Sequence, residues 1–288
     1  MLTTASMRIS MLACAVLAST CRARAEPAFV QLAEARRLVA QMQVQLSKAS
    51  DASDRAVLAD TDAQSVEFAR QARSATEVVA AAVPELAARL SGPDAEQLAQ
   101  FRQQLDLYRR VDGEILALAV ENTNLKAQRL AFGPVSQAAD ALTAALDATA
   151  ATSAPAKRCQ IQELVARVEL AIKDIQILQA PHIAEPTDPE MDRLEREMAS
   201  RRSVAAAALS GLAAAGGAGL GRHLGSARTA LERFDDLSRQ VIALSRRNTN
   251  VRSLRLALQQ KAALTAAADA SLASLEEALA KEAFSGTR

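Results

Sequence analysis

Aromatic residues are almost absent from this sequence: it has no tryptophan, one tyrosine (Tyr108) and six phenylalanines, together 2% of 288 residues. The strands of β-sandwiches and barrels draw heavily on aromatic and β-branched residues, so this scarcity argues against a sheet. Half of the residues are hydrophobic and 23% are charged, which is the composition of a folded chain. Alanine is abundant, and it is the strongest helix former. The composition therefore predicts an all-α fold.

Residue types that commonly carry catalysis or hold metals are equally scarce. The chain has two histidines, His182 and His223, and only one cysteine, Cys159, beyond its amino-terminal segment. These residues supply neither a zinc-ligand set, nor a Cys-x-x-Cys-His haem attachment, nor a Cys/His dyad. The sequence has no Gly-x-Ser-x-Gly or Walker motif, and we interpret acidic pairs such as Asp235-Asp236 as solvated helix surface. We expect no enzyme activity, no cofactor and no metal site.

The first 25 residues have the pattern of a secretory signal. Arg8 precedes an apolar run from Ile9 to Ala18, and Ala23-Arg24-Ala25 matches a small-x-small cleavage site. An uncleaved anchor is a weaker alternative, because the run is shorter than the roughly 20 residues that a membrane span needs. Acylation at Cys21 is a second alternative, but a threonine before the cysteine fits the bacterial lipobox poorly.

Removal of this segment takes away three arginines and no acid, which leaves 31 basic residues against 33 acidic ones and a formal net charge of −2. Nucleic-acid-binding domains usually carry a basic excess, so we expect no nucleic-acid partner. No apolar run of span length remains in the mature chain. We therefore expect a periplasmic or secreted protein without a membrane span.

One unit is written twice in the chain, at an offset of 126 residues. The clearest match joins "ENTNLKAQRLA" (121–131) to "RNTNVRSLRLA" (247–257). The offset also relates Leu38-Val39-Ala40 to Leu164-Val165-Ala166, Thr61-Asp62 to Thr187-Asp188, and Ala80-Ala81-Ala82 to Ala206-Ala207-Ala208. An offset held over about ninety residues indicates a tandem duplication. We predict a signal peptide at 1–25, a first domain at 26–147, a linker at 148–157 and a second domain at 158–284.

Helix-breaking residues divide each copy into four expected helices. The second helix starts at a Thr-x-x-Gln or Thr-x-x-Glu capping box, at Thr61 and Thr187. Residues 91–94 and the glycine-rich stretch 216–225 would connect the second helix to the third. The third helix of the first copy is expected to run over 94–132 and to end at Gly133-Pro134. The resulting prediction is two tandem antiparallel four-helix bundles.

A seam, meaning a row of residues spaced alternately three and four apart on one helix face, runs along the expected third helix of each copy. In the first copy the seam includes Asn122 and Arg129, and Asn248 and Arg255 hold the same places in the second. A buried asparagine in a seam costs stability but disfavours slipped registers. We therefore interpret these asparagines as register-specifying, and expect leucine at Asn248 to raise the melting temperature.

Two longer segments resemble a known family. "ILALAVENTNLKAQRLAFGPVSQAADAL" (115–142) and "VIALSRRNTNVRSLRLAL" (241–258) are similar to the third-helix segment of the four-helix-bundle ligand-sensing domain of bacterial methyl-accepting chemotaxis receptors. The passage "LAIKDIQILQAPHIAEPTDPEMDRLEREM" (170–198) resembles the family's first-to-second helix connection. The resemblance implies a sensor-type module that binds a small molecule or a partner helix. The chain departs from such receptors because no membrane span or signalling hairpin follows Phe284, so we expect signalling to need a membrane-bound partner.

The candidate ligand site lies where the start of the second helix and the end of the third are expected to meet. Asn124 and Asn250 lie about 200° around the helix from the seam asparagines, next to small residues, and we expect a close neighbour there. Helix amino termini and a guanidinium together favour an anionic small molecule or an acidic partner segment. The alternative is that the arginines only extend to water. The candidate residues are Asn122, Asn124, Arg129, Asn248, Asn250 and Arg255.

The competing function is a structural or adaptor protein of the bacterial cell envelope.

Overall fold

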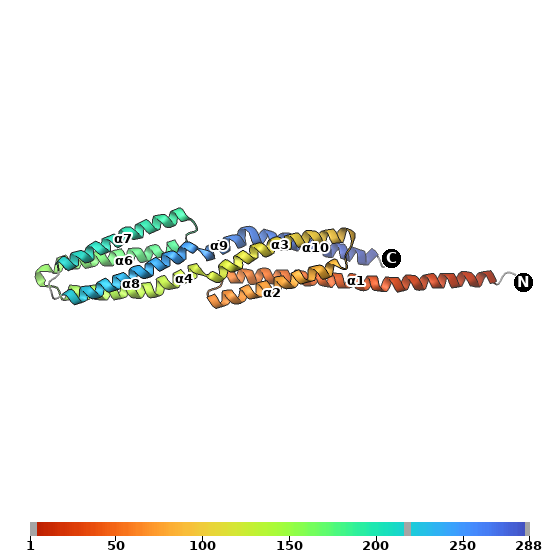
Figure 1. The fold of residues 1–288 in the computed structure, drawn as a ribbon, viewed down its shortest axis with the longest axis horizontal. Helices are drawn as coiled ribbons and strands as arrows, with labels where there is room; N and C mark the ends of the chain where they lie inside the picture. Colours follow the sequence, from red (N-terminus) through yellow and green to blue (C-terminus); the bar gives the residue numbers. More distant parts are fainter. Residues whose placement is uncertain (1–4, 216–219, 286–288) are drawn as a thin grey trace. The chain divides into compact units, whose positions relative to one another are not determined.

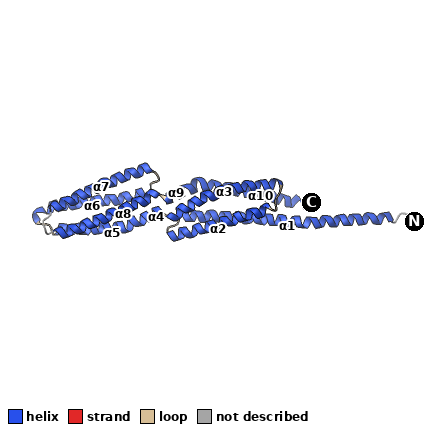
Figure 2. Ribbon diagram, viewed as in Figure 1, coloured by secondary structure: helices blue, strands red, loops and turns tan. Residues whose placement is uncertain are grey.

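The computed structural model describes residues 5–215 and 220–285, and every element within these ranges is a helix (Figures 1 and 2). The all-α prediction is confirmed for these residues. In chain order the elements are α1 (Ala5–Val57), α2 (Asp62–Ala87), α3 (Gly92–Glu121), α4 (Thr123–Leu130), the π turn η1 (Ala131–Val135), α5 (Ser136–Ala151), the short η2 (Pro155–Lys157), α6 (Arg158–Ala184), α7 (Asp188–Ala215), α8 (Gly221–Arg247), α9 (Thr249–Leu256), the π turn η4 (Ala257–Lys261) and α10 (Ala262–Ser285).

The first helix extends across the expected signal segment. The side chains of residues 5–28 lie outside the described part of the chain, so signal cleavage stays a prediction. Likewise, residues 216–219 of the expected glycine-rich loop are not described, and α8 already begins at Gly221. None of the described helices combines the length and the apolar character that crossing a bilayer requires.

Each copy contains two shorter helices and one long helical span, instead of four separate helices. The expected break at Gly133-Pro134 is wrong, because the chain passes through η1 and continues as α5. Proline lacks an N–H and its ring collides with a carbonyl in an α-helix, but a π turn holds one more residue and moves that carbonyl away. The expected linker at 148–157 is also partly helical, since α5 runs to Ala151.

The chain divides into two compact units that do not follow the two copies. Unit 1 comprises residues 1–59, 63–116 and 256–288, and unit 2 comprises 60–62 and 117–255. Unit 1 therefore joins α1, α2 and α3 of the first copy to α10 of the second. Unit 2 joins α6, α7 and α8 to α4 and α5 of the first copy. The expected domains 26–147 and 158–284 follow the sequence repeat, and they stay a prediction.

Helix length explains this exchange. α2 has 26 residues and is about 39 Å long at about 1.5 Å per residue. The span from α3 to α5 covers residues 92–151, which is about 90 Å of helix at the same rise. Its second half, α4 and α5, packs against α6 and α8 of the second copy, which bury its apolar face. The sequence offset showed the duplication, but these lengths decide which helices share a core.

Each unit has its own hydrophobic core. In unit 1 the core includes residues of α1, α2, α3 and α10: Leu38, Met42, Leu46, Val79, Leu86, Phe101, Tyr108, Leu272 and Leu275. In unit 2 it includes residues of α5, α6, α7 and α8: Leu142, Leu146, Val168, Ile172, Ile175, Leu209, Leu212, Phe234 and Val241. Segments of both copies thus contribute to each core.

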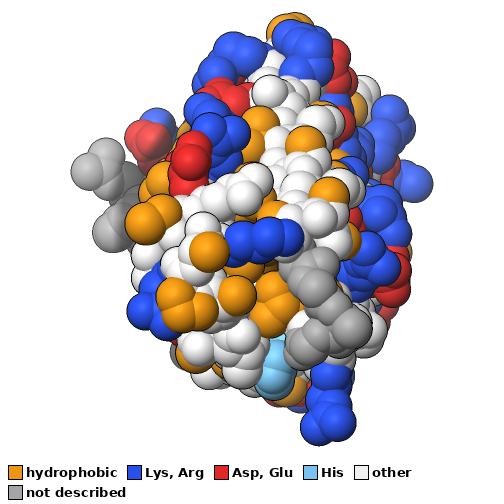
Figure 3. Space-filling view, turned by 90° about the vertical axis from the view of Figure 1, so that its left-hand side faces the viewer, with side chains coloured by type: hydrophobic (Ala, Val, Ile, Leu, Met, Phe, Trp, Pro, Cys, Tyr) orange, Lys and Arg blue, Asp and Glu red, His pale blue; other side chains and the backbone are white. Residues whose placement is uncertain are grey.

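Charged side chains cover the outer faces of the helices. Basic and acidic groups lie side by side along the flanks of the face in Figure 3. Arg193 pairs with Glu190 at 2.7 Å and Arg167 with Glu163 at 2.6 Å, each within one helix turn. Exposed pairs of this kind contribute little to stability, typically below about 1 kcal/mol.

Candidate functional site

Asn122 and Asn248 interrupt the two long helical spans. Each lies in the left-handed region, with φ of 50° and 53°, and they are the only non-glycine residues with positive φ among the described ones. Asparagine tolerates this conformation better than other residues with a Cβ atom. Asn122 therefore ends α3, where the sequence predicted a continuous helix over 94–132.

The two Asn-Thr-Asn segments exchange reciprocal hydrogen bonds within unit 2. The backbone N–H of Thr123 donates to Oγ1 of Thr249 at 3.0 Å, and the N–H of Thr249 donates to Oγ1 of Thr123 at 3.2 Å. The backbone N–H groups of Asn124 and Asn250 each donate to the other's Oδ1 at 3.1 Å. The repeated segment therefore exists twice because each copy supplies the acceptors for the other's free helix-start amides.

The side-chain amides complete this cluster. Nδ2 of Asn124 donates to Oδ1 of Asn248, and Nδ2 of Asn250 donates to Oδ1 of Asn122, both at 2.8 Å. Asn248 also donates to the carbonyl of Glu185 at 2.8 Å. Asn122 is fully buried, and its Nδ2 has no hydrogen-bond partner among the described residues.

These contacts change the expectation for Asn248. Leucine there would lose both side-chain hydrogen bonds and would have to adopt a positive φ, so the expected rise in melting temperature loses its basis. The prediction that Asn124 and Asn250 face a close neighbour is confirmed, because each contacts the other copy's segment. The four asparagines come together, but as a cluster that mostly satisfies its own polar groups.

The two candidate arginines lie apart from the cluster. Arg129 is exposed; it donates to the carbonyl of Asp60 at 2.8 Å, and its NH1 lies 3.5 Å from Asp62. Arg255 is also exposed, and no hydrogen bond joins either arginine to the asparagines among the described residues. The left-handed residue rotates the helix that follows. The next seam residues after the two arginines, Phe132 and Leu258, therefore turn outward and are 61% and 69% exposed. The seam prediction is wrong beyond the asparagines.

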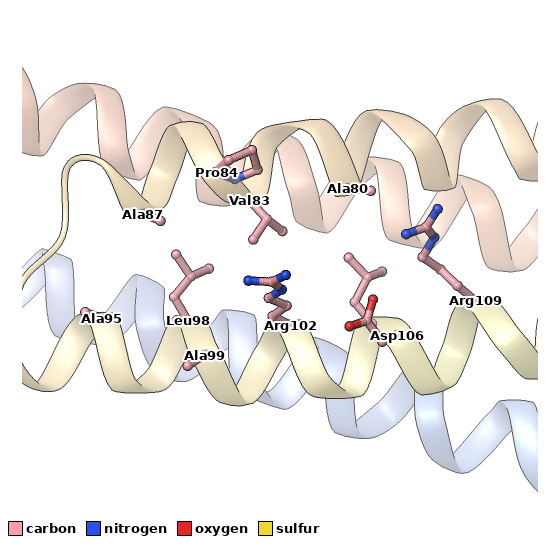
Figure 4. Close-up of a pocket in the computed structure, with 11 residues that line it drawn as sticks. Ala80, Val83, Pro84, Ala87, Ala95, Leu98, Ala99, Arg102, Asp106 and Arg109 are labelled. Carbon is pink, nitrogen blue, oxygen red and sulfur yellow. The ribbon is translucent and has the colours of Figure 1, made fainter.

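A groove that the sequence interpretation missed lies between α2 and α3 in unit 1 (Figure 4). Its volume is about 480 Å³, within the range of about 300–1,000 Å³ for small-molecule sites. Val83, Leu98 and Leu105 are buried and form its apolar floor. The walls are mostly small residues, namely Ala80, Pro84, Ala87, Ala95 and Ala99.

Three charged residues of α3 line one wall of this groove, from its middle to one end. Arg102, Asp106 and Arg109 are spaced four and three residues apart, so they share one helix face, as Figure 4 shows. Among the described residues, no carboxylate oxygen lies within 4.0 Å of either guanidinium. The groove thus combines an apolar floor with two unpaired guanidinium groups.

A smaller polar pocket of about 150 Å³ adjoins it, and Arg109 lines both. The pocket reaches Asp112, which is 3% exposed and accepts a hydrogen bond from Oγ of Ser53 at 2.5 Å. Burial raises the pKa of Asp112, and the Ser53 hydrogen bond offsets this only in part. The positive charge of Arg73, at the pocket edge, also lowers the pKa of Asp112.

Tyr108 is fully buried next to this pocket. Burial, followed by the nearby Asp112 charge, strongly raises the pKa of its phenol. The nearby Thr76 hydroxyl lowers this pKa slightly against the two larger effects. That hydroxyl donates its own hydrogen bond to the Ala72 carbonyl at 2.9 Å. The Tyr108 hydroxyl has no hydrogen bond of good geometry among the described residues. Buried polar groups are usually paired. The unit 1 core therefore holds an unpaired phenol and a buried carboxyl beside this pocket.

The second copy fills the same place differently. At the 126-residue offset, Arg202 stands for Thr76 and Asp235 stands for Arg109. Nε of Arg202 lies 3.0 Å from Oδ1 of Asp235, in a geometry that makes an ion pair but not a hydrogen bond. Burial raises the pKa of Asp235, with the Arg202 charge opposing it. The interpretation of Asp235 as solvated surface is therefore wrong, since its side chain is 19% exposed.

A second buried polar group joins α6, α7 and α8 in unit 2. His182 is fully buried, with Nε2 2.9 Å from Oε1 of Glu195 and Nδ1 2.9 Å from Oγ of Ser245. Oγ of Ser245 donates to the His182 carbonyl at 2.8 Å, and Arg246 donates to Glu195 at 2.6 Å. Burial acts to raise the pKa of Glu195, but the hydrogen bonds from Arg246 and His182 outweigh it and lower that pKa.

This arrangement contains a serine, a histidine and a carboxylate, but Ser245 and His182 are both fully buried, so a substrate cannot reach them in this structure. At the offset of 126, the first copy has alanine in place of His182, Glu195 and Ser245. The network therefore replaces apolar packing with hydrogen bonds. Among the described residues, no group of three or more His, Cys, Asp or Glu side chains could hold a metal ion.

Comparison with protein-family models and with curated proteins found no match for this chain. The sequence signal for the groove lies in the chain itself. Alignment of the two copies shows Thr76 and Arg109 replaced together by an arginine and an aspartate, which is the pattern of a pair that is in contact.

Proposed function

We propose that this protein is a non-enzymatic, sensor-type binding module and that the groove between α2 and α3 receives a small molecule. The observation that carries the proposal is the groove itself. It has an apolar floor, unpaired guanidinium groups on one wall and a buried carboxyl in the adjoining pocket. An apolar pocket with a few polar groups is the usual form of a ligand site.

The fold connects such a site to the rest of the long helical span. α2 and α3 line the groove, and α3 leads directly into Asn122, the left-handed residue that interrupts the long span. A ligand that contacts both helices would stabilise one arrangement of α2 against α3, and a ligand shifts a conformational equilibrium only through such differential contacts. In this proposal each unit is a four-helix bundle with coiled-coil-like packing, completed by a segment of the other copy.

The resemblance to the periplasmic domains of chemotaxis receptors supports the same class of function. In this proposal the chain is exported through its amino-terminal signal, acts in the periplasm or outside the cell, and passes its state to a membrane-bound signalling partner. The ligand site moves from the six residues named from the sequence to the groove, because the asparagines bind one another and the two arginines are not with them.

A thermal-shift screen of small molecules tests the proposal, with two variants as filters. Ala99→Trp places a large side chain at an exposed position of the groove wall. Gly225→Trp is the matched control, because Gly225 holds the equivalent place in the second copy and a Cβ atom there would contact nothing within 4 Å. A true ligand should stabilise the parent and Gly225→Trp but not Ala99→Trp. Compounds that stabilise Ala99→Trp equally would place binding elsewhere.

The competing function is that of a structural or adaptor protein of the cell envelope. The asparagine cluster favours it, since its hydrogen bonds tie the two copies together without any ligand. A purely structural role predicts that no compound in the screen distinguishes Ala99→Trp from Gly225→Trp.

A further inference from the structure

Charge on the groove wall differs between the two copies. In unit 1, α3 places Arg102, Asp106 and Arg109 along the groove, two positive groups and one negative. The equivalent residues of α8 in the second copy are Arg228, Glu232 and Asp235, one positive group and two negative. The same helix face has therefore opposite net charge in the two copies.

The two arginines of the groove in unit 1 also lack an ion-pair partner among the described residues. Neither Arg102 nor Arg109 has a carboxylate oxygen within 4.0 Å among the described residues. In the second copy, by contrast, Asp235 is already paired with Arg202 at 3.0 Å, at the place where Arg109 and Thr76 leave a pocket in the first. An anion in this part of the groove would be attracted by two guanidinium groups, and it would break no existing ion pair.

The apolar part of the groove sets the rest of the ligand. From Ala95 to Arg109 the lining of α3 extends about 21 Å at about 1.5 Å per residue. Leu98 and Leu105 lie on its floor and alanines on its walls, so most of the bound molecule would contact hydrocarbon.

We infer that the groove binds an apolar molecule with a single negative charge; this inference rests on the proposed function. Its anionic group lies at Arg102 and Arg109, and its apolar body lies along Leu98 toward Ala95. In the second copy the residue at the place of Arg109 is Asp235, an acid that is already paired with Arg202, so we expect no such site there. The chain therefore binds one such molecule.

The test uses two fluorescent probes on the full chain: 8-anilinonaphthalene-1-sulfonate, which is apolar and anionic, and Nile red, which is apolar and uncharged. The Arg102→Gln, Arg109→Gln double variant should weaken the affinity for the sulfonate probe about tenfold or more, because two charge-assisted contacts are lost. Nile red should bind the parent and the double variant equally. Arg228→Gln, at the equivalent place of the second copy, is the control and should change neither affinity.

Ala99→Trp separates the inference from the proposed function. If it weakens both probes while the arginine variant weakens only the sulfonate, both are supported. If Ala99→Trp weakens both probes but the arginine variant leaves sulfonate binding unchanged, the groove binds ligands without charge selection and only the inference fails. If Ala99→Trp leaves both affinities unchanged, or if neither probe binds the parent, both fail. A stoichiometry of two sulfonates per chain, with the second lost in Arg228→Gln, would overturn the single-site inference.

Discussion

At position 248 we expect the glycine variant to be more stable to unfolding than the alanine variant, which reverses the usual order of these residues in a helix. In an ordinary helix interior, alanine is more stable than glycine by about 1 kcal/mol. Asn248 has φ of 53°, where a Cβ atom meets the following carbonyl and costs about 1–2 kcal/mol. Asn248→Gly should therefore be more stable than Asn248→Ala by about 1 kcal/mol.

Both variants should be less stable than the parent. Each loses the hydrogen bond to the Glu185 carbonyl and the one from Asn124, both at 2.8 Å. Asn124 keeps a bond to the Ile183 carbonyl at 2.6 Å, but the Glu185 carbonyl loses its partner from Asn248. A buried group left unpaired costs about 1–3 kcal/mol, so Asn248→Gly should lose about that much.

Urea unfolding followed by circular dichroism at 222 nm measures these differences, provided that the slope of the transition stays constant between variants. Ala243→Gly is the matched control, because Ala243 is an exposed position in the same helix, α8, and should show the ordinary order. If Asn248→Ala is as stable as Asn248→Gly or more so, residue 248 is not in the left-handed region. If neither variant is less stable than the parent, the hydrogen bonds of the cluster contribute nothing net.

Two further predictions concern unit 1. Asp112 has an ordinary pKa of 3.8 and a raised pKa when folded, so its carboxyl costs stability progressively as the pH rises from 3.8 through the folded value. Asp112→Asn should therefore unfold at a higher urea concentration than the parent at pH 7, and the difference between the two midpoints should be smaller at pH 3. If the variant is less stable than the parent at pH 7, the carboxylate is stabilised in the fold. The Thr76→Arg, Arg109→Asp double variant should install the second copy's ion pair and abolish sulfonate-probe binding without loss of melting temperature. Retained binding would mean that the pair does not close the site.

Sequence reasoning recovered the all-α class and the close neighbours of Asn124 and Asn250, because each depends on a periodic or repeated pattern. It placed Asn122 inside a helix because a buried seam asparagine and a left-handed one look alike in sequence; only the neighbouring hydrogen bonds distinguish them. The same error misplaced Arg129, because one left-handed residue rotates every later residue of the helix to a different face. The exchange of helices depended on relative lengths, which were misjudged when Gly133-Pro134 was taken as an end.

The groove escaped prediction for a different reason. Its walls are alanines, which are common throughout the chain, and its arginines have the spacing of ordinary surface charges. Comparison of the two copies would have pointed to this region, because Thr76 and Arg109 are replaced there by Arg202 and Asp235, which can form an ion pair. In a duplicated chain, a pair of positions that changes together between copies is informative without any other sequence.

The late position of α10 has a consequence for how the protein is made. α10 packs against α1, and the hydrogen bond from Gln43 to Glu276 spans 233 residues. At a synthesis rate of about 5–20 residues per second, α1 emerges roughly 10–50 seconds before the helix that completes its core. The segments of unit 2 lie within residues 60–255, so unit 2 can assemble while unit 1 still lacks its fourth segment. During that interval the apolar face of α1 has no native cover from α10, and a chaperone that holds the chain should bind there first.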